Sequence, residues 1–252
     1  MSFRLILTSA LLMLSGAIML AQSEEFIPHV VDGQEIGDTG RGFRTEIFVI
    51  NTGDEPVSVT VSLTSDEGEP MERFSDISGP PGGDVSVRTL DLPPRGSASL
   101  TTLRGPFVQL GWARVAPSQS VHVLANIRYE VIQTNEAIAS AAVQSGPVAH
   151  SLTSIGQIGG EAGSTGLAIL NTNEQETTVT VTLRLRTGEI VAETEVPLGP
   201  RGKVVQFLNE STFFPDQTEF RGVVDLSSDQ PISIVAILVE ELSWTTFPPT
   251  NR

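Results

Sequence analysis

Apolar and polar side chains alternate along most of this chain. The stretches 45–51, 57–63 and 177–183 place β-branched or aromatic residues at every second position, which is typical of strands with one buried face. Turn-forming Asn, Gly and Pro residues separate these stretches, as in 51–56. No stretch of useful length shows the helical period, and 209–214 is expected to be a turn or a single 3₁₀ coil. The pattern predicts an all-β chain of short antiparallel strands.

The chain also contains an internal repeat, because blocks of its first half align with blocks of its second half. The aligned blocks are 45–69 with 165–189, 94–96 with 200–202, and 111–130 with 222–241. The first copy is longer, and we place its extra residues within 74–87, around the Gly-Pro-Pro-Gly-Gly of 79–83. A repeat this long is a domain rather than a solenoid unit. With about seven strands expected in each copy, we predict two tandem antiparallel β-sandwiches of immunoglobulin type.

Domain boundaries follow from the ends of the repeat. Residues 1–23 combine Arg4, an apolar stretch and a final Ala-Gln-Ser, which is the pattern of a secretory signal peptide cleaved after Ser23. The first copy then spans 24–146 and the second 147–252, with the boundary at Gly146-Pro147. We expect few contacts to cross this linker, so that each copy buries its own core.

The alternation also predicts which side chains of the second copy are buried. We expect Thr178, Thr180 and Thr182 to face water. The predicted core consists of Leu167, Ile169, Val179, Val181, Leu183, Val224, Leu226, Ile234 and Ala236.

Composition narrows the possible partners and the compartment. The net charge of −15 disfavours nucleic acid and anionic membrane surfaces as partners. The chain has no cysteine, and Lys203 is its only lysine beside many arginines. Together with the signal-peptide pattern, this predicts a bacterial protein exported to the periplasm, the cell surface or the medium, without disulfides and without stable membrane insertion after cleavage.

Several of these blocks resemble those of uncharacterised secreted bacterial proteins built of tandem immunoglobulin-like repeats. The similar features are the 111–115 strand with its Trp112, the Ser118-Gln119 turn, Tyr129, and the strand-ending asparagines Asn51 and Asn171. The second copy lacks a matching tryptophan. The resemblance implies a fold and a location, and it brings no catalytic residues.

Residues typical of catalysis are scattered. His29, His122 and His150 lie on different expected strands; His29 and His150 begin the two copies at matching positions and should lie in different domains. The sequence has no G-x-S-x-G turn, phosphate-binding loop or dinucleotide-binding motif. We therefore expect a protein that is not an enzyme and uses no cofactor.

Acidic turns are the remaining candidates for a metal site. Asp32, Glu35 and Asp38 lie within one short segment, and 66–69 contains three more carboxylates. Such oxygen ligands suit calcium, but neither segment has the spacing of a known calcium loop. Asp32, Glu35 and Asp38 are thus weak calcium candidates, and solvated turns are the favoured interpretation.

Three classes of function remain open. The favoured one is a non-catalytic structural or adhesive module that presents loops or strand edges to a protein or glycan partner. The second is a periplasmic pilus-assembly-type chaperone, whose cleft needs paired basic residues; Arg114 and Arg128 are available, against the strongly acidic charge. The third is a carbohydrate-binding module, which needs exposed coplanar aromatics; Trp112, Trp244 and Tyr129 are among the few available.

Overall fold

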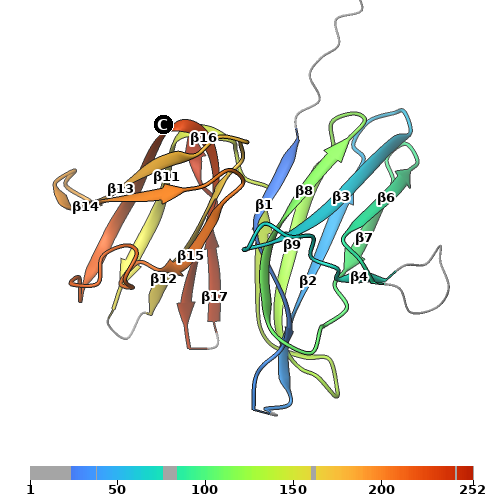
Figure 1. Ribbon diagram of the computed structural model, residues 1–252, viewed down its shortest axis with the longest axis horizontal. Coiled ribbons are helices and arrows are strands. Elements are labelled where there is room, and N and C mark those ends of the chain that lie inside the picture. Colours follow the sequence, from blue (N-terminus) through green and yellow to red (C-terminus); the bar gives the residue numbers. More distant parts are fainter. Residues whose placement is uncertain (1–23, 38, 76–83, 160–162, 242, 252) are drawn as a thin grey trace, which may run out of the picture.

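The prediction of an all-β protein is confirmed. The computed structural model describes residues 24–37, 39–75, 84–159, 163–241 and 243–251, and within these ranges it contains strands and turns but no helix. The expected signal peptide, Asp38 and the insert segment 76–83 lie outside the described residues. Figure 1 shows two antiparallel sandwiches side by side. Residues 209–214 form turns, as expected.

The first sandwich consists of two sheets that share β1. Its strands are β1 (Glu25–Gln34), β2 (Arg41–Ile50), β3 (Val57–Ser65), β4 (Phe74–Ser75), β5 (Asp84–Val85), β6 (Val87–Leu92), β7 (Ser97–Thr101), β8 (Gln109–Pro117), β9 (His122–Val131) and β10 (Glu136–Gln144). One sheet has the order β6-β3-β8-β1, and the other has the order β7-β2-β9-β10. The pairs β2 with β7 and β3 with β8 are also adjacent in immunoglobulin sandwiches, while β9 pairs with β2 rather than with β8. The short β4 and β5 pair with each other where the first copy carries its insert.

The second sandwich repeats this arrangement. Its strands are β11 (Ala149–Ile158), β12 (Ser164–Asn171), β13 (Thr177–Leu185), β14 (Ile190–Leu198), β15 (Lys203–Phe207), β16 (Phe220–Glu240), β17 (Ser243–Phe247) and β18 (Thr250–Asn251). The long β16 replaces both β8 and β9: its first half pairs with β13 and β11, and its second half with β12 and β17. The internal repeat of the sequence is therefore a repeat of strand pairing.

Pairing register also corrects one prediction. Val31 N–H donates to Thr45 Oγ1 in the first copy, and Gln157 N–H donates to Thr165 Oγ1 in the second. Since Thr45 and Thr165 are aligned, Val31 corresponds to Gln157, and His29 corresponds to Ile155. The expected match of His29 with His150 is wrong, because β1 and β11 align in a different register from the strands that follow.

The predicted core of the second copy is confirmed, since all nine residues are buried in one apolar cluster. Alternation also holds for Thr178, which is exposed, and Thr180, which is partly exposed. It fails for Thr182, which is buried at 6% exposure and donates a hydrogen bond to Glu193 Oε2 at 3.0 Å. A hydroxyl with its own acceptor on β14 can be covered without losing a hydrogen bond.

Contacts between the copies are more extensive than the sequence predicted. Gly146 is buried, and β10 ends just before it while β11 begins just after it. The apolar cluster of the first copy includes Ala168 and Val235 of the second, both buried. The expectation of few contacts across the linker is wrong, because an apolar outer face of the second sandwich packs against the first.

Candidate functional site

Exposed apolar side chains lie in two segments at one end of the first sandwich. Ile36, in the turn after β1, is 86% exposed, and Phe107, in the segment before β8, is 66% exposed. Leu103 and Val108 in that second segment are also exposed. The two segments are joined by hydrogen bonds, and exposed apolar side chains on adjoining segments mark contact surfaces more often than single ones do. We call these four residues, Ile36, Leu103, Phe107 and Val108, the apolar tip.

Asp32 holds the two segments of the apolar tip together. Its buried carboxylate accepts hydrogen bonds from the backbone N–H groups of Arg104 and Gly105, each at 2.8 Å, and Arg73 Nε lies 3.1 Å from Asp32 Oδ2. Gln34 N–H also donates to the Gly105 carbonyl at 3.0 Å. Charge-assisted hydrogen bonds of this kind are stronger than neutral ones. The Asp32 carboxylate therefore fixes the two segments of the apolar tip relative to each other.

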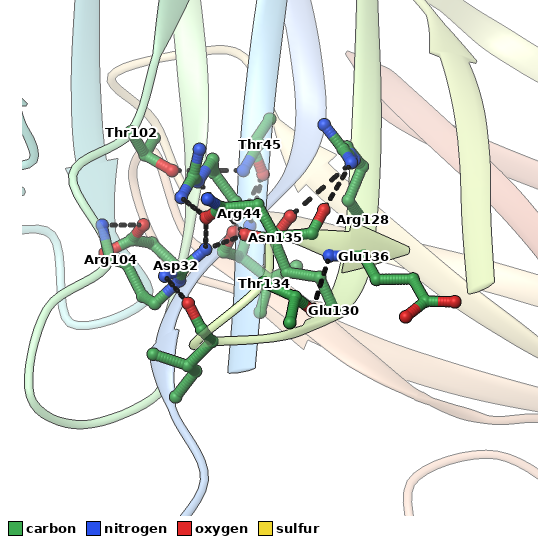
Figure 2. Close-up of polar contacts among 12 residues, drawn as sticks. Asp32, Arg44, Thr45, Thr102, Arg104, Arg128, Glu130, Thr134, Asn135 and Glu136 are labelled. Atoms are coloured by element: carbon green, nitrogen blue, oxygen red, sulfur yellow. Dashed lines mark hydrogen bonds and ion pairs between the residues drawn. The ribbon is translucent and has the colours of Figure 1, made fainter. Parts of the chain in front are cut away.

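A second buried carboxylate, that of Glu130, belongs to the same network of charged groups (Figure 2). Arg44 Nε lies 3.1 Å from Glu130 Oε1, the Arg128 guanidinium lies 3.7 Å from Oε2, and Arg104 contacts the same carboxylate. Arg104 thus joins both buried carboxylates, through its backbone N–H to Asp32 and its side chain to Glu130. Buried charges need such partners, and this network supports the fold beneath the apolar tip.

The weak calcium candidates do not form a cation site within the described residues. Asp32 faces a guanidinium and two N–H groups, which are donors and repel a cation. Glu35 accepts hydrogen bonds from the Thr39 hydroxyl and the Tyr129 hydroxyl, each at 2.9 Å. Asp38 lies outside the described residues. Across the described ranges, no three His, Asp or Glu side chains are close enough to share a metal ion.

Asp66, from the second acidic segment, has a different role. Lys203 of the second copy has a buried side chain, and its Nζ lies 2.8 Å from Asp66 Oδ1 and 2.5 Å from the carbonyl oxygen of Gly111. Burial lowers the pKa of Lys203 to about 8, although the charge of Asp66 acts in the opposite direction. The only lysine of the chain therefore connects the two copies, a role that the sequence analysis missed.

His29 belongs to the same contact. Its Nδ1 lies 3.5 Å from Lys203 Nζ, and burial, followed by the lysine charge, lowers its pKa to about 3. Its imidazole is therefore neutral at physiological pH. His122 and His150 are exposed on other strands, so the three histidines are not brought together.

Aromatic side chains concentrate where the copies meet. The rings of Phe43 and Tyr129 in the first copy each lie 6.2 Å from the ring of Trp244 in the second, in stacked orientation. Trp112 is buried against Phe26 and against Leu170 of the second copy. Trp112, which has no counterpart in the second copy, therefore contributes to the contact between the copies.

A pocket of about 340 Å³ remains open between the copies. On one side it is lined by β1, β2, β8 and β9, and on the other by β12, β15, β16 and β17. Most lining side chains are apolar; His29, Gln206 and Glu210 are the polar ones. Pockets of this size and lining are typical small-molecule sites.

The two basic residues considered for a chaperone cleft already have partners. Arg114 pairs with Glu24, which lies at the start of the first copy. Arg128 belongs to the Glu130 network, and its guanidinium also donates to the Asn135 carbonyl at 3.1 Å. The structure does not bring Arg114 and Arg128 together as a pair.

One sequence signal for the contact between the copies was available. Alignment of the repeats places Glu46, Asn126 and Arg128 of the first copy opposite Gly166, Ile237 and Val239 of the second. These positions point to the outer face, which is polar in the first copy and apolar in the second. A strand that is apolar on both faces is covered on both. Because the outer positions are polar in the first copy and apolar in the second, they indicate that the outer face of the second copy is the covered one.

No protein-family model matches this chain, and no curated protein matches it. Among the described residues, no helix has the length and apolar character needed to cross a membrane.

Proposed function

We propose that this protein is a non-catalytic, exported bacterial module that binds a protein or glycan partner through the apolar tip of its first sandwich. The observation that carries the proposal is the exposure of Ile36 and Phe107 on two segments held together by Asp32. Loops on a rigid sandwich are common binding sites. Export is supported by the signal-peptide pattern of residues 1–23.

A binding role agrees with the observation that the buried charged side chains Asp32, Glu130 and Lys203 already have partners. Glu130 and Asp32 are engaged by arginines and backbone N–H groups, and Lys203 is engaged by Asp66. A general acid or base needs reach to a substrate proton, and these buried groups are already occupied. We therefore favour a protein without enzymatic activity.

The two alternatives receive less support from the geometry. A chaperone cleft needs free basic groups for a carboxylate, while Arg114 and Arg128 are paired with acids. A carbohydrate platform needs exposed rings, while Trp112 is buried and Trp244 stacks against Phe43 between the copies.

Binding of labelled protein to cells of the producing bacterium tests the proposal. The double variant Ile36→Ser/Phe107→Ser should weaken binding at least about tenfold, since hot-spot residues dominate contact energies. The matched control Val87→Ser/Ile190→Ser removes apolar side chains that are each 50% exposed elsewhere, and it should bind normally. Pretreating the cells with protease or with periodate distinguishes a protein partner from a glycan.

Equal binding by both double variants, with unchanged melting temperatures, would rule out the apolar tip as the contact surface. Turnover of an ester, peptide or glycoside by the purified protein, abolished by one substitution, would rule out the non-catalytic class.

A further inference from the structure

The pocket between the two copies that is lined by β1, β2, β8, β9, β12, β15, β16 and β17 has the size and the apolar lining of a small-molecule site. Its volume is about 340 Å³, and its walls include Phe43 and Leu110 of the first copy and Val205, Ile237 and Trp244 of the second. The pocket is a cleft that opens to solvent and has mostly apolar walls, which is the form that small-molecule sites commonly take.

Gly166 keeps one wall of this pocket open. It lies within β12, and an added Cβ there would find its nearest neighbours, the Ile237 carbonyl and the Phe207 ring, at 3.7 Å. Neither a left-handed backbone nor a close contact requires glycine at this position. Glycine inside a strand weakens it, and it often marks a place where a ligand approaches the backbone. The absent side chain enlarges the pocket.

Polar groups around the pocket select against an anionic ligand. Lys203 Nζ forms an ion pair with the Asp66 carboxylate at 2.8 Å, donates to the Gly111 carbonyl, and lies 3.5 Å from His29 Nδ1. The charge of this ammonium is therefore already balanced by Asp66, and an anion would have to compete with these contacts. Glu210 also lines the pocket, and the net charge of −15 further disfavours anions.

His29 offers the pocket one hydrogen-bond donor. An ammonium group only donates, so the Nδ1 facing Lys203 Nζ is an acceptor, and the ring hydrogen of the neutral imidazole is on Nε2. His29 lines the pocket. A ligand oxygen that accepts a hydrogen bond, from a hydroxyl or a carbonyl group, suits this donor.

We propose that the pocket between the two sandwiches binds an uncharged apolar molecule that carries a single hydroxyl or carbonyl oxygen. An apolar cavity of roughly 150 Å³ holds one benzene molecule. This pocket therefore suits a ligand of about 10–14 non-hydrogen atoms, for example a ten-carbon alcohol. Val108 belongs both to the pocket lining and to the apolar tip, but the argument for the pocket does not use this residue, and neither proposal depends on the other.

Calorimetric titration of residues 24–252 with 1-decanol, and separately with decanoate, tests the chemical class. We expect 1-decanol to bind and to raise the melting temperature, because a ligand of the folded state stabilises it. Decanoate should bind at least about tenfold more weakly, because its carboxylate would be buried without a free cation. Absence of 1-decanol binding up to its solubility limit, or equal binding of decanoate, would overturn the proposal.

Matched variants test the location. Gly166→Leu places a side chain in the pocket and should abolish binding of 1-decanol, whereas Gly199→Leu adds the same side chain where nothing lies within 4 Å and should leave binding unchanged. In the unaltered protein, 1-decanol methylene protons should show nuclear Overhauser effects to the rings of Phe207 and Trp244, which needs no variant to fold. Binding without these effects, or full binding by a folded Gly166→Leu protein, would show that the ligand lies elsewhere.

Discussion

At the scale of residues, the repeated asparagines Asn51 and Asn171 satisfy corresponding backbone groups in the two copies. The Asn51 amide donates to the carbonyl oxygens of Glu55 and Pro93, and its Oδ1 accepts from Gly53 N–H. Asn171 makes the corresponding three bonds, to Gln175, Gly199 and Asn173. The amide of asparagine both donates and accepts at a short reach, and so it ties the turn after one strand to the turn of another.

Replacing Asn171 by alanine should therefore destabilise the second copy. The substitution leaves two carbonyl groups and one N–H without this partner, and we expect the free energy of unfolding to fall by about 2–3 kcal/mol. Urea denaturation measures the change. Asn209→Ala removes an exposed asparagine and should change stability by less than about 0.5 kcal/mol; equal effects would contradict the role of Asn171.

His29 should make stability depend on pH. Burial and Lys203 lower its pKa to about 3 in the folded state, against about 6.5 for an ordinary histidine. Between these values the unfolded chain binds a proton that the folded chain does not, so this contribution is full above pH 6.5 and decreases as the pH falls toward 3. Between pH 7.5 and pH 5, we expect a loss of about 1–2 kcal/mol from this group.

Denaturation of His29→Gln at both pH values tests this expectation, since the variant should lose less stability on acidification than the original protein. His122→Gln, at an exposed position, is the control and should retain the original pH dependence. If both variants respond to pH as the original protein does, the titration of His29 is not the cause.

At the scale of elements, strand alternation decides which face of each strand is buried. Val181 on β13 lies opposite Leu226 on β16 and is fully buried, while its neighbour Thr180 is partly exposed and lies opposite Glu195 on β14. Burial alternates in the same way along the aligned strand β3, where the buried Val61 lies opposite Val115. Adjacent positions on one strand therefore differ sharply in their tolerance of a polar side chain.

A pair of asparagine substitutions measures this difference. Val181→Asn buries an amide without partners and should reduce the free energy of unfolding by about 3 kcal/mol or more. Thr180→Asn should change it by less than about 1 kcal/mol; an uncharged residue is chosen because an aspartate would face Glu195. Chemical denaturation of both variants gives the two values, and similar losses would show that the faces of β13 are assigned incorrectly.

At the scale of the whole molecule, the copies depend on each other unequally. The apolar cluster of the second copy is built from its own residues. The cluster of the first copy is completed by Ala168 and Val235, with Val205 and Ile237 packed against it. Figure 1 shows β1 of the first sandwich next to the sheet that contains β12, β15 and β17. The second copy thus covers part of the apolar core of the first copy.

Cutting the chain at Gly146-Pro147 should reveal this inequality. We expect residues 147–252 to fold alone and to self-associate through the apolar outer face that the first copy normally covers. Residues 24–146 should melt at a lower temperature alone than when mixed with the second fragment. Circular dichroism and sedimentation measure both effects; an unfolded second fragment, or a first fragment unaffected by mixing, would contradict the inferred arrangement.

The sequence by itself determined the all-β class, the internal repeat and the buried face of most strands. These features depend on local periodicity and turn residues such as Asn51 and Asn171, which act over a few positions. The contact between the copies was decided by tertiary structure. Lys203 has no local signal that identifies Asp66 as its partner, and the apolar outer positions Ile237 and Val239 show that a face is covered without saying by what. Asp32 and Glu35 read alike as acidic turn residues, yet one is buried against Arg73 and the other accepts from Tyr129. Burial and charge pairing arise between residues distant along the chain, and only the folding of each sandwich and the packing of one against the other bring those residues together.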